Sequence, residues 1–420
     1  MINELKAYRN EVAESTIYSN VAKKSLQTLQ IENTLTCLDI NIGESCNTEV
    51  SIVEVIATFP NLTDLKYSSK SRLYLQIEYF YHITTTPHQH MVTLELRAYI
   101  ISKTDIKAII TFCPKLRRLV LNRCPSDVLH AIVECQNITM KNLEILAFNP
   151  DDIHPPTPTL SSLSTASTET TKRRNTATMS TRVTNDDAIE ESKEEKGLRI
   201  LYTNNGGTPV PARDILPLIY QNRKTLETVY ACISRITETK LKSFYKKFKN
   251  FELEKIKNLT TWAHQGIQEL MLRAIRNSVS LVRLDLLDLG YIKSLVDTLI
   301  KMPPLCHIKF VGTGMTRLDR EQFIQLLKRY AQLANDENTV SLRSIAIQKC
   351  DHVITNEILE ALGNIETLEE VWLSEPIHTT SIVEIHKFIA KLGKQHLKGI
   401  YFDNICAITD TTLLLYLVTW

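Results

Sequence analysis

Histidine and cysteine side chains are the groups in this 420-residue chain that could ligate a metal ion. His82, His88 and His90 form the closest group of histidines, and no cysteine lies near them. Structural zinc sites need clustered cysteine and histidine ligands. The nine cysteines are spread over the whole length and none belongs to a C-x-x-C pair, which is typical of free thiols in a reducing compartment. We therefore expect no metal site and interpret the three histidines as a solvated loop group, with metal ligation as the less favoured alternative.

Catalytic motifs would be a second source of chemistry. The sequence contains no phosphate-binding G-x-x-x-x-G-K-[ST] loop, no G-x-G-x-x-G fingerprint, no H-E-x-x-H motif and no G-x-S-x-G nucleophile elbow. Adjacent glycines occur at Gly206 and Gly207, but the surrounding Asn-Gly-Gly-Thr-Pro segment is explained as a turn. Carboxylates and histidines are numerous, yet linear spacing alone cannot pair them as acid and base. The sequence therefore predicts a protein that is not an enzyme and that needs no cofactor.

Composition excludes further classes of protein. Lys and Arg total 49 against 47 for Asp and Glu, so a net charge of +2 gives no global attraction to nucleic acid or to an anionic membrane. No apolar stretch reaches the roughly 18 residues that a membrane span requires. The start, Met1 to Lys6, lacks the basic-then-apolar order of a secretory signal. We therefore expect a cytoplasmic or nuclear protein with no nucleic-acid partner and no membrane partner.

A repeated apolar motif decides the expected fold. The pattern L-x-x-L-x-L, or a close variant, starts at Leu35, Leu62, Met91, Leu116, Leu143, Leu198, Leu226, Leu253, Leu281, Leu305, Leu342, Leu368 and Leu397. Ten of the twelve intervals between these starts measure 24 to 29 residues, which is the period of leucine-rich repeats. The fourth position is aliphatic in every unit, whereas the sixth is weaker at Thr203, Ala231 and Asn258. The sequence therefore predicts an α/β leucine-rich-repeat solenoid of about 13 repeats.

Each unit must contain a short strand and a helical return. Alternate side chains of a strand face opposite sides, so the motif leucines enter the core together. Helical stretches are expected between the strands, for example at 127–133, 319–333 and 356–362. Because one unit is too small to bury its own apolar faces, neighbouring units must stack. The stack predicts a parallel sheet on the concave side of an arc and helices on the convex side.

Two intervals between motifs exceed the repeat period. The longer one holds residues 150–196, a Ser/Thr-rich segment with an acidic end and few large apolar side chains, which predicts disorder. This insert is either a spacer or a phosphorylation-regulated arm. The other interval predicts one longer helix from Leu318 to Ala334. The expected organisation is a leading helical segment or partial repeat at 1–25, a repeat block at 26–149, the insert at 150–196, and a second repeat block at 197–420 continuous with the first.

The segment from Cys113 to Cys124 reads C-P-K-L-R-R-L-V-L-N-R-C. It resembles the cysteine-containing repeat, C-P-x-L-x-x-L-x-L-x-x-C, of the F-box and leucine-rich-repeat proteins. The continuation of that subtype, I-T-D-x-x-L, occurs at 408–413 and approximately at 236–241. Asparagine is absent from the ninth position of all thirteen units, which disfavours the Asn-ladder types of repeat, including the family that activates the Ran GTPase.

The resemblance implies a division of labour in a ubiquitin ligase. In the family, an F-box recruits the Skp1–cullin–RING ligase while the repeat arc holds the substrate. No segment of this chain matches an F-box, so Skp1 and cullin are expected partners only if an F-box is supplied upstream. We therefore expect substrate recognition for an SCF-type (Skp1–cullin–F-box) ubiquitin ligase. The alternative is a scaffold or regulatory module that uses the same arc without an F-box.

The binding surface is expected on the concave face, where the third and fifth residues of each motif should point into solvent. A basic stretch from Lys255 to Lys309 stands beside aromatic residues there, and aromatic side chains beside cations are typical of protein-binding hot spots. We expect an acidic or phosphorylated segment of a partner protein to bind between Tyr202 and Trp372. The alternative is that the aromatic rings only cover their neighbours. The candidate partner-binding residues are Tyr202, Tyr230, Lys255, Lys257, Arg283, His307, Lys309, Trp372 and Tyr401.

Overall fold

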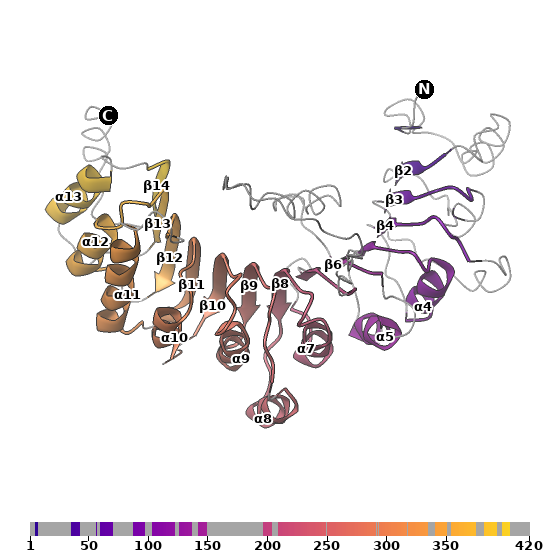
Figure 1. Cartoon of the computed structure of the whole chain (residues 1–420), viewed down its shortest axis with the longest axis horizontal. Helices are drawn as coiled ribbons and strands as arrows, with labels where there is room; N and C mark the ends of the chain where they lie inside the picture. The colour runs from indigo at the N-terminus through magenta and orange to yellow at the C-terminus, as the bar shows by residue number, and fades with distance from the viewer. Residues whose placement is uncertain are drawn as a thin grey trace, which may run out of the picture.

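The described part of the chain forms one open arc. The computed structural model describes residues 5–6, 35–42, 56, 59–69, 87–96, 103–121, 126–136, 142–148, 196–203, 209–248, 250–290, 292, 294–316, 318–334, 341–350, 354–374, 382–392 and 397–403. Strands line the inner side of the arc and helices cover its outer side (Figure 1). Among these residues, none of the helices combines the length and the apolar character that crossing a membrane would require.

The described strands, fourteen in number, form a single parallel sheet whose spatial order is the order of the chain. Neighbouring units are therefore stacked one after another, as the repeat predicts, and the sheet does not close. The strands are β1 (Leu5–Lys6), β2 (Cys37–Ile42), β3 (Asp64–Ser69), β4 (Thr93–Leu96), β5 (Arg118–Leu121), β6 (Ile145–Phe148), β7 (Ile200–Thr203), β8 (Thr228–Ile233), β9 (Asn258–Ala263), β10 (Arg283–Leu289), β11 (His307–Thr316), β12 (Ser344–Cys350), β13 (Glu370–Ser374) and β14 (Gly399–Asp403).

A helix follows most of these strands and returns the chain to the start of the next one. The helices expected at 127–133, 319–333 and 356–362 are confirmed, and the longest interval between motifs in the second block is spanned by α11. Asp319 caps α11, since its carboxylate accepts a hydrogen bond from the Gln322 amide at 2.9 Å. The helices are α4 (Lys103–Phe112), α5 (Ser126–Gln136), α7 (Ala212–Gln221), α8 (Glu238–Lys247), α9 (Gln265–Ile275), α10 (Leu295–Lys301), α11 (Arg320–Leu333), α12 (Asn356–Gly363) and α13 (Ile382–Leu392).

The core is a continuous layer between the sheet and the helices. The first, fourth and sixth motif positions of the unit that contains β10 are Leu281, Leu284 and Leu286, and all three are buried. Phe310 occupies the sixth position in β11 and packs against Phe323 of α11, with ring centroids 6.4 Å apart. The first and fourth motif positions are likewise buried in the units from Leu62 to Leu368, so the apolar side chains of one unit complete the core of the next.

The strand register confirms the motif frame in twelve units and corrects it in one. The third motif positions pair in one continuous row across the sheet. In the unit that starts at Leu253 the frame was wrong, because β9 places Asn258 rather than Lys255 in that row. The frame that fits the strand, Ile256-x-x-Leu259-x-Thr261, begins three residues later, and all three of its side chains are buried.

The two segments outside the repeat blocks fall almost entirely outside the described residues. Of the leading segment 1–25, the structure describes Leu5 and Lys6, which pair with Leu38 and Asp39. Of the predicted insert 150–196, it describes Lys196. β6 and β7 pair directly across the position of the insert, with Ile145 opposite Ile200. The sheet therefore runs without interruption from the first block into the second.

A hydrogen-bond pattern repeats along the edge where the strands begin. The carbonyl of each second motif position accepts bonds from the amides of the second and third positions of the next unit, as Val92 does from Arg117 and Arg118 at 2.9 and 3.0 Å. This pattern aligns the second positions of all units in one row, which we call the rim row. Its members are Thr36, Thr63, Val92, Arg117, Glu144, Arg199, Glu227, Lys257, Val282, Cys306, Arg343, Glu369 and Lys398.

Candidate protein-binding surface

The middle of the concave face is closed by buried side chains. They lie on the strands from β4 to β7, where Arg118 donates two hydrogen bonds to Glu95 at 2.9 and 3.1 Å. These buried concave residues are Thr93, Glu95, Val120, Ile145, Ala147 and Ile200. Asp39 of β2 and Lys66 of β3 are exposed before this buried stretch, and a second open surface begins after it with Tyr202 of β7.

Tyr202 and Tyr230 form a stacked pair at the start of that open surface. They lie opposite each other on β7 and β8, with ring centroids 4.6 Å apart and an interplanar angle of 21°. Each ring shields one face of the other, and both side chains are half-buried. This geometry fits the covering role that was the alternative to partner binding.

Trp372 and Tyr401 form an exposed aromatic pair on the concave face. Their exposed fractions are 41% and 51%, and their ring centroids lie 5.1 Å apart on β13 and β14. The ammonium of Lys309 lies 5.9 Å from the centre of the Trp372 ring, a cation–π distance. Gly399 permits the close approach of the Tyr401 ring, because a β-carbon there would come within 3.0 Å of it. We call Lys309, Trp372 and Tyr401 the aromatic platform.

Trp262 is an exposed concave residue that the motif frame missed. It follows Asn258 and Thr260 on the same face of β9 and is 42% exposed. In register it lies beside Cys232 of β8 and Leu287 of β10. The alternative frame starting at Ile256 would have identified it, because the alternation of that frame continues to residue 262.

The expected basic stretch is smaller in the structure than in the sequence. Lys255 lies in a turn before β9 and Lys257 directly precedes the strand, so neither occupies the concave positions predicted for them. The cause is the three-residue shift of the frame. Lys257 instead donates to Glu227 Oε2 at 2.8 Å in the rim row. The prediction that Lys255 and Lys257 are concave cations is therefore wrong.

The remaining charged residues of that stretch are largely neutralised. Arg283 donates to Asp285 Oδ2 at 2.9 Å, and the Thr260 hydroxyl donates to the same oxygen at 3.2 Å. Burial and the nearby Arg283 guanidinium lower the pKa of His307, so its ring is neutral near pH 7. Lys309 forms no ion pair with a described residue, and its ammonium faces Trp372. Between Lys255 and Lys309, the described concave face therefore offers Lys309 beside an aromatic ring rather than a basic strip.

Opposite charges alternate along the rim row. Arg117 donates to Glu144 at 2.7 and 2.9 Å, and Glu227 accepts from Arg199 at 2.6 Å and from Lys257 at 2.8 Å. Arg199, Glu227 and Lys257 thus form one charged triplet. Glu369 forms a second with Arg343 at 3.7 Å and Lys398 at 2.7 Å. Opposite charges on neighbouring strands stabilise the pairing of those strands. The ladder therefore supports the register of the stacked units.

Replacing Glu227 with Gln is expected to cost about 1–2 kcal/mol of unfolding free energy near pH 7, because two cations then lack their shared carboxylate. Burial alone would raise the pKa of Glu227, but the hydrogen bonds from Lys257 and Arg199 outweigh burial and hold it below 4.5. A carboxylate whose pKa is lowered by folding stabilises the fold at pH values above its unfolded-state pKa. This stabilisation is lost as the pH falls through the folded-state pKa. Urea unfolding should therefore separate wild type from variant at pH 7, and the difference should shrink as the pH falls below about 4.3, the value of a glutamate in the unfolded chain. A constant difference across this range would contradict the assignment.

The histidines near residue 88 and the buried cysteines have surroundings that fit structural roles. His88 is buried, and its ring nitrogens contact the Phe59 carbonyl at 3.0 Å and the Met91 amide at 3.0 Å. His90 is exposed, and His82 lies outside the described residues. In the described ranges, no three His, Cys, Asp or Glu side chains are grouped closely enough to hold a metal ion. Burial raises the pKa of Cys113 to about 12 and that of Cys232 to about 11, so neither thiol is a thiolate nucleophile.

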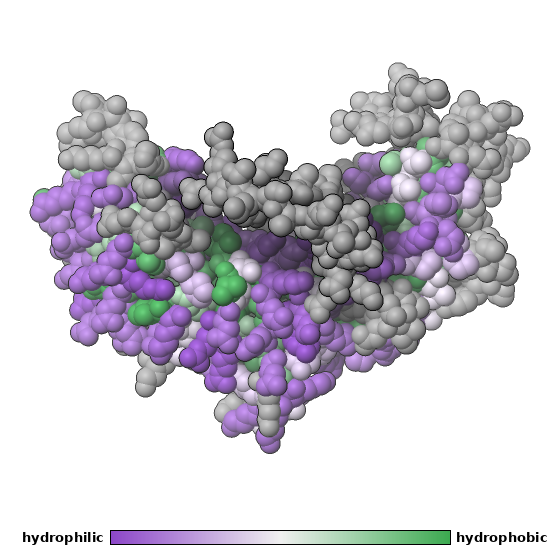
Figure 2. Space-filling model, viewed as in Figure 1, coloured by the Kyte–Doolittle hydropathy of each residue, from purple (hydrophilic) through white to green (hydrophobic). Residues whose placement is uncertain are grey.

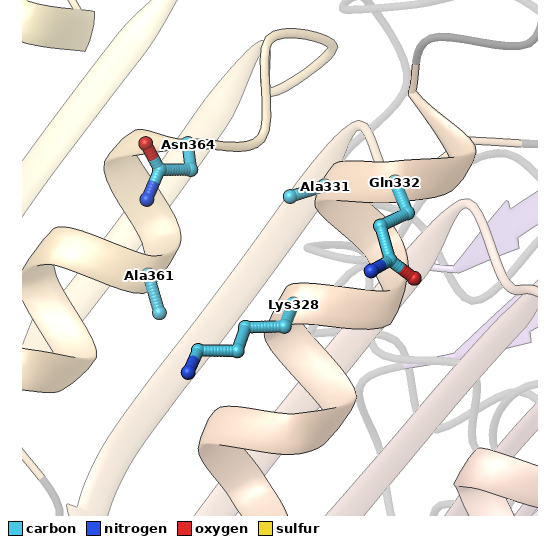
Figure 3. A pocket seen from close by; sticks show the side chains of 5 residues that line it. All are labelled: Lys328, Ala331, Gln332, Ala361 and Asn364. Carbon is cyan, nitrogen blue, oxygen red and sulfur yellow. The ribbon is translucent and has the colours of Figure 1, made fainter.

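A shallow pocket of about 340 Å³ lies on the convex side, between α11 and α12. Figure 3 shows the Lys328 side chain extending from α11 toward α12, with Ala331 and Ala361 between the helices. Gln332 and Asn364 complete its lining. Because the lining contains no carboxylate, histidine or cysteine, it offers no acid–base pair. None of the candidate partner-binding residues contributes to it.

The surface view places polar and apolar residues differently. Figure 2 shows mainly hydrophilic residues over the outer helices of the second block, while apolar residues reach the surface near the middle of the arc.

No protein-family model matches the chain, and a search of curated proteins finds no match either.

Proposed function

We propose that the chain is a leucine-rich-repeat solenoid of the cysteine-containing subtype. The repeat period and the continuous row of motif positions support this assignment. Asp288 and Lys349, the eighth residues of their units, both have left-handed backbone angles, with φ of 56° and 51°. The chain turns there, and the ninth residues, Leu289 and Cys350, enter the core. In the cysteine-containing subtype, the cysteine would occupy this buried ninth position.

The proposed function is the binding of a partner protein by the concave face of the second block. The observation that carries the proposal is the exposure of Trp262, Trp372 and Tyr401 on one face of the sheet. Exposed large aromatic side chains concentrate at protein-binding surfaces, because rigid rings supply contact area at a low cost in conformational entropy. The pocket between α11 and α12 contains no acid–base pair that would favour catalysis instead.

The chemistry of the aromatic platform narrows the partner segment. Trp372 and Tyr401 suit an apolar or aromatic side chain of the partner, which can stack on their rings. Lys309 suits one acidic or phosphorylated side chain beside it. Since Arg283 is paired with Asp285, a partner with a single acidic group fits this surface better than a strongly acidic one.

The more specific role is substrate recognition for an SCF-type ubiquitin ligase, and it is supported by the resemblance of the C-P-K-L-R-R-L-V-L-N-R-C segment to the repeats of F-box proteins. Affinity purification of the tagged full chain from its native cells, with quantitative mass spectrometry, tests this role. Recovery of Skp1 and a cullin together with a substrate is the expected result. A partner recovered in equal amount with the chain but without Skp1 would contradict the ligase role and favour a scaffold or regulatory module.

A further inference from the structure

The rim row contains one apolar interruption, which lies between its two charged triplets. Val282 and Cys306 occupy successive positions there, between Lys257 and Arg343. Val282 is 38% exposed, and Val279, three residues earlier, is 80% exposed. Cys306 is partly exposed. We call Val279, Val282 and Cys306 the rim notch.

Both ends of the rim notch carry positive charge. Each flanking triplet combines two cations with one carboxylate, which leaves a net charge of +1 on each side. Lys257 and Arg343 are the members next to the notch, and both side chains are about half exposed. An occupant that complements this surface therefore has an aliphatic centre and one acidic group on either side.

The spacing of the strands sets the spacing of those groups. Lys257 and Arg343 are separated by three steps between neighbouring strands, and at about 4.8 Å for each step the distance along the rim is about 14 Å. An extended peptide advances about 3.4 Å per residue, so residues i and i+4 are also about 14 Å apart and face the same side as residue i+2. The matching pattern is acid-x-aliphatic-x-acid.

We infer that the rim notch is a second docking site of this chain, and that it binds an extended segment of a partner protein with the pattern acid-x-aliphatic-x-acid. The aliphatic side chain packs on Val282 and Cys306, while the two carboxylates reach Lys257 and Arg343. This site is separate from the aromatic platform, which lies on the concave face of β11, β13 and β14. A partner held on the concave face could therefore be contacted at the rim by another segment or by another protein.

The test uses the full chain and a synthetic peptide with the core Glu-Ser-Leu-Ser-Glu in Gly/Ser flanks, at up to about 2 mM because a short peptide of this kind is expected to bind with a Kd near 1 mM. The readout is the rate at which iodoacetamide alkylates Cys306, followed by mass spectrometry. Bound peptide is expected to slow this rate by about threefold, as a Kd near 1 mM implies at 2 mM peptide. Cys37, a partly exposed thiol on β2, should be unaffected.

A peptide of identical composition, Glu-Glu-Ser-Leu-Ser, provides the matched control, since its carboxylates are adjacent and cannot reach both cations. Its Kd should be at least about threefold higher than that of the first peptide, so it should slow the alkylation of Cys306 less. Val282→Asp should abolish protection by the first peptide. Lys257→Gln and Arg343→Gln should each weaken protection, whereas Trp372→Ala should leave it unchanged. Equal protection by the two peptides, no protection at the highest concentration, or protection that persists in Val282→Asp overturns the inference. Thermal unfolding of each variant verifies that it folds, and the Trp372→Ala result separates this site from the proposed concave one.

Discussion

Replacing Phe310 with Ala is expected to destabilise the protein by about 3–5 kcal/mol, the cost of removing a large buried aromatic side chain. Phe310 is fully buried between the sheet and α11, where it contacts Phe323. Phe310 lies on β11 and Phe323 on α11 of the same unit. A simple side-chain rotation cannot fill the space that the missing ring leaves between these two elements. The substitution therefore leaves a cavity in the middle of the second repeat block.

The architecture determines how this loss is observed. In a stack of units, each unit contacts only its neighbours, so a weak interior unit separates the stack into two parts that unfold at different denaturant concentrations. Equilibrium urea unfolding, combined with hydrogen exchange of β10, β11 and β12, should show early loss of protection in these strands. Val279→Ala is the control, because this exposed valine should change stability by less than about 0.5 kcal/mol. A loss below about 1 kcal/mol for Phe310→Ala would contradict the assigned core position.

The sequence predicted the repeating architecture because its signal is local and recurs. Within one unit the motif apolar residues are three and two positions apart, so the core-facing side of each strand can be identified without knowledge of its neighbours. Leu284 and Leu286 are examples, and both are buried as expected. The helices at 126–136 and 356–363 follow from the same short-range pattern. The repeat subtype and its biological role remain proposals.

The surface was harder to predict because it depends on relations between units. In the unit of β9, two possible motif frames share Ile256, and only the pairing with β8 and β10 selects the later one. The ion-pair ladder joins residues such as Arg199 and Glu227 that are 28 positions apart, so it becomes visible only when the register is known. Val120 and Ile145 occupy outward-facing motif positions and are nevertheless buried, which alternation within a strand does not predict.

Replacing Trp372 with Ala is expected to weaken binding of the partner recovered with the full chain by about 30-fold or more, which corresponds to the 2 kcal/mol or more of an interface hot spot. The indole is half-exposed and lies beside Tyr401 and below the Lys309 ammonium, so its removal eliminates the centre of the aromatic platform. The fold should be little affected, because the side chain points away from the core. Titration of the purified partner by calorimetry or fluorescence measures the change in Kd.

Matched variants separate a binding role from a general change of the surface. Trp372→Phe keeps an aromatic ring and should retain most of the affinity, whereas Lys309→Gln should weaken an acidic partner by about threefold to tenfold and reduce the dependence of Kd on salt. Val383→Ala removes an exposed apolar side chain from α13 on the convex side and should leave Kd unchanged. If Trp372→Ala binds within about twofold of wild type while its unfolding free energy is unchanged, the partner uses another surface and the concave platform is excluded as its main site.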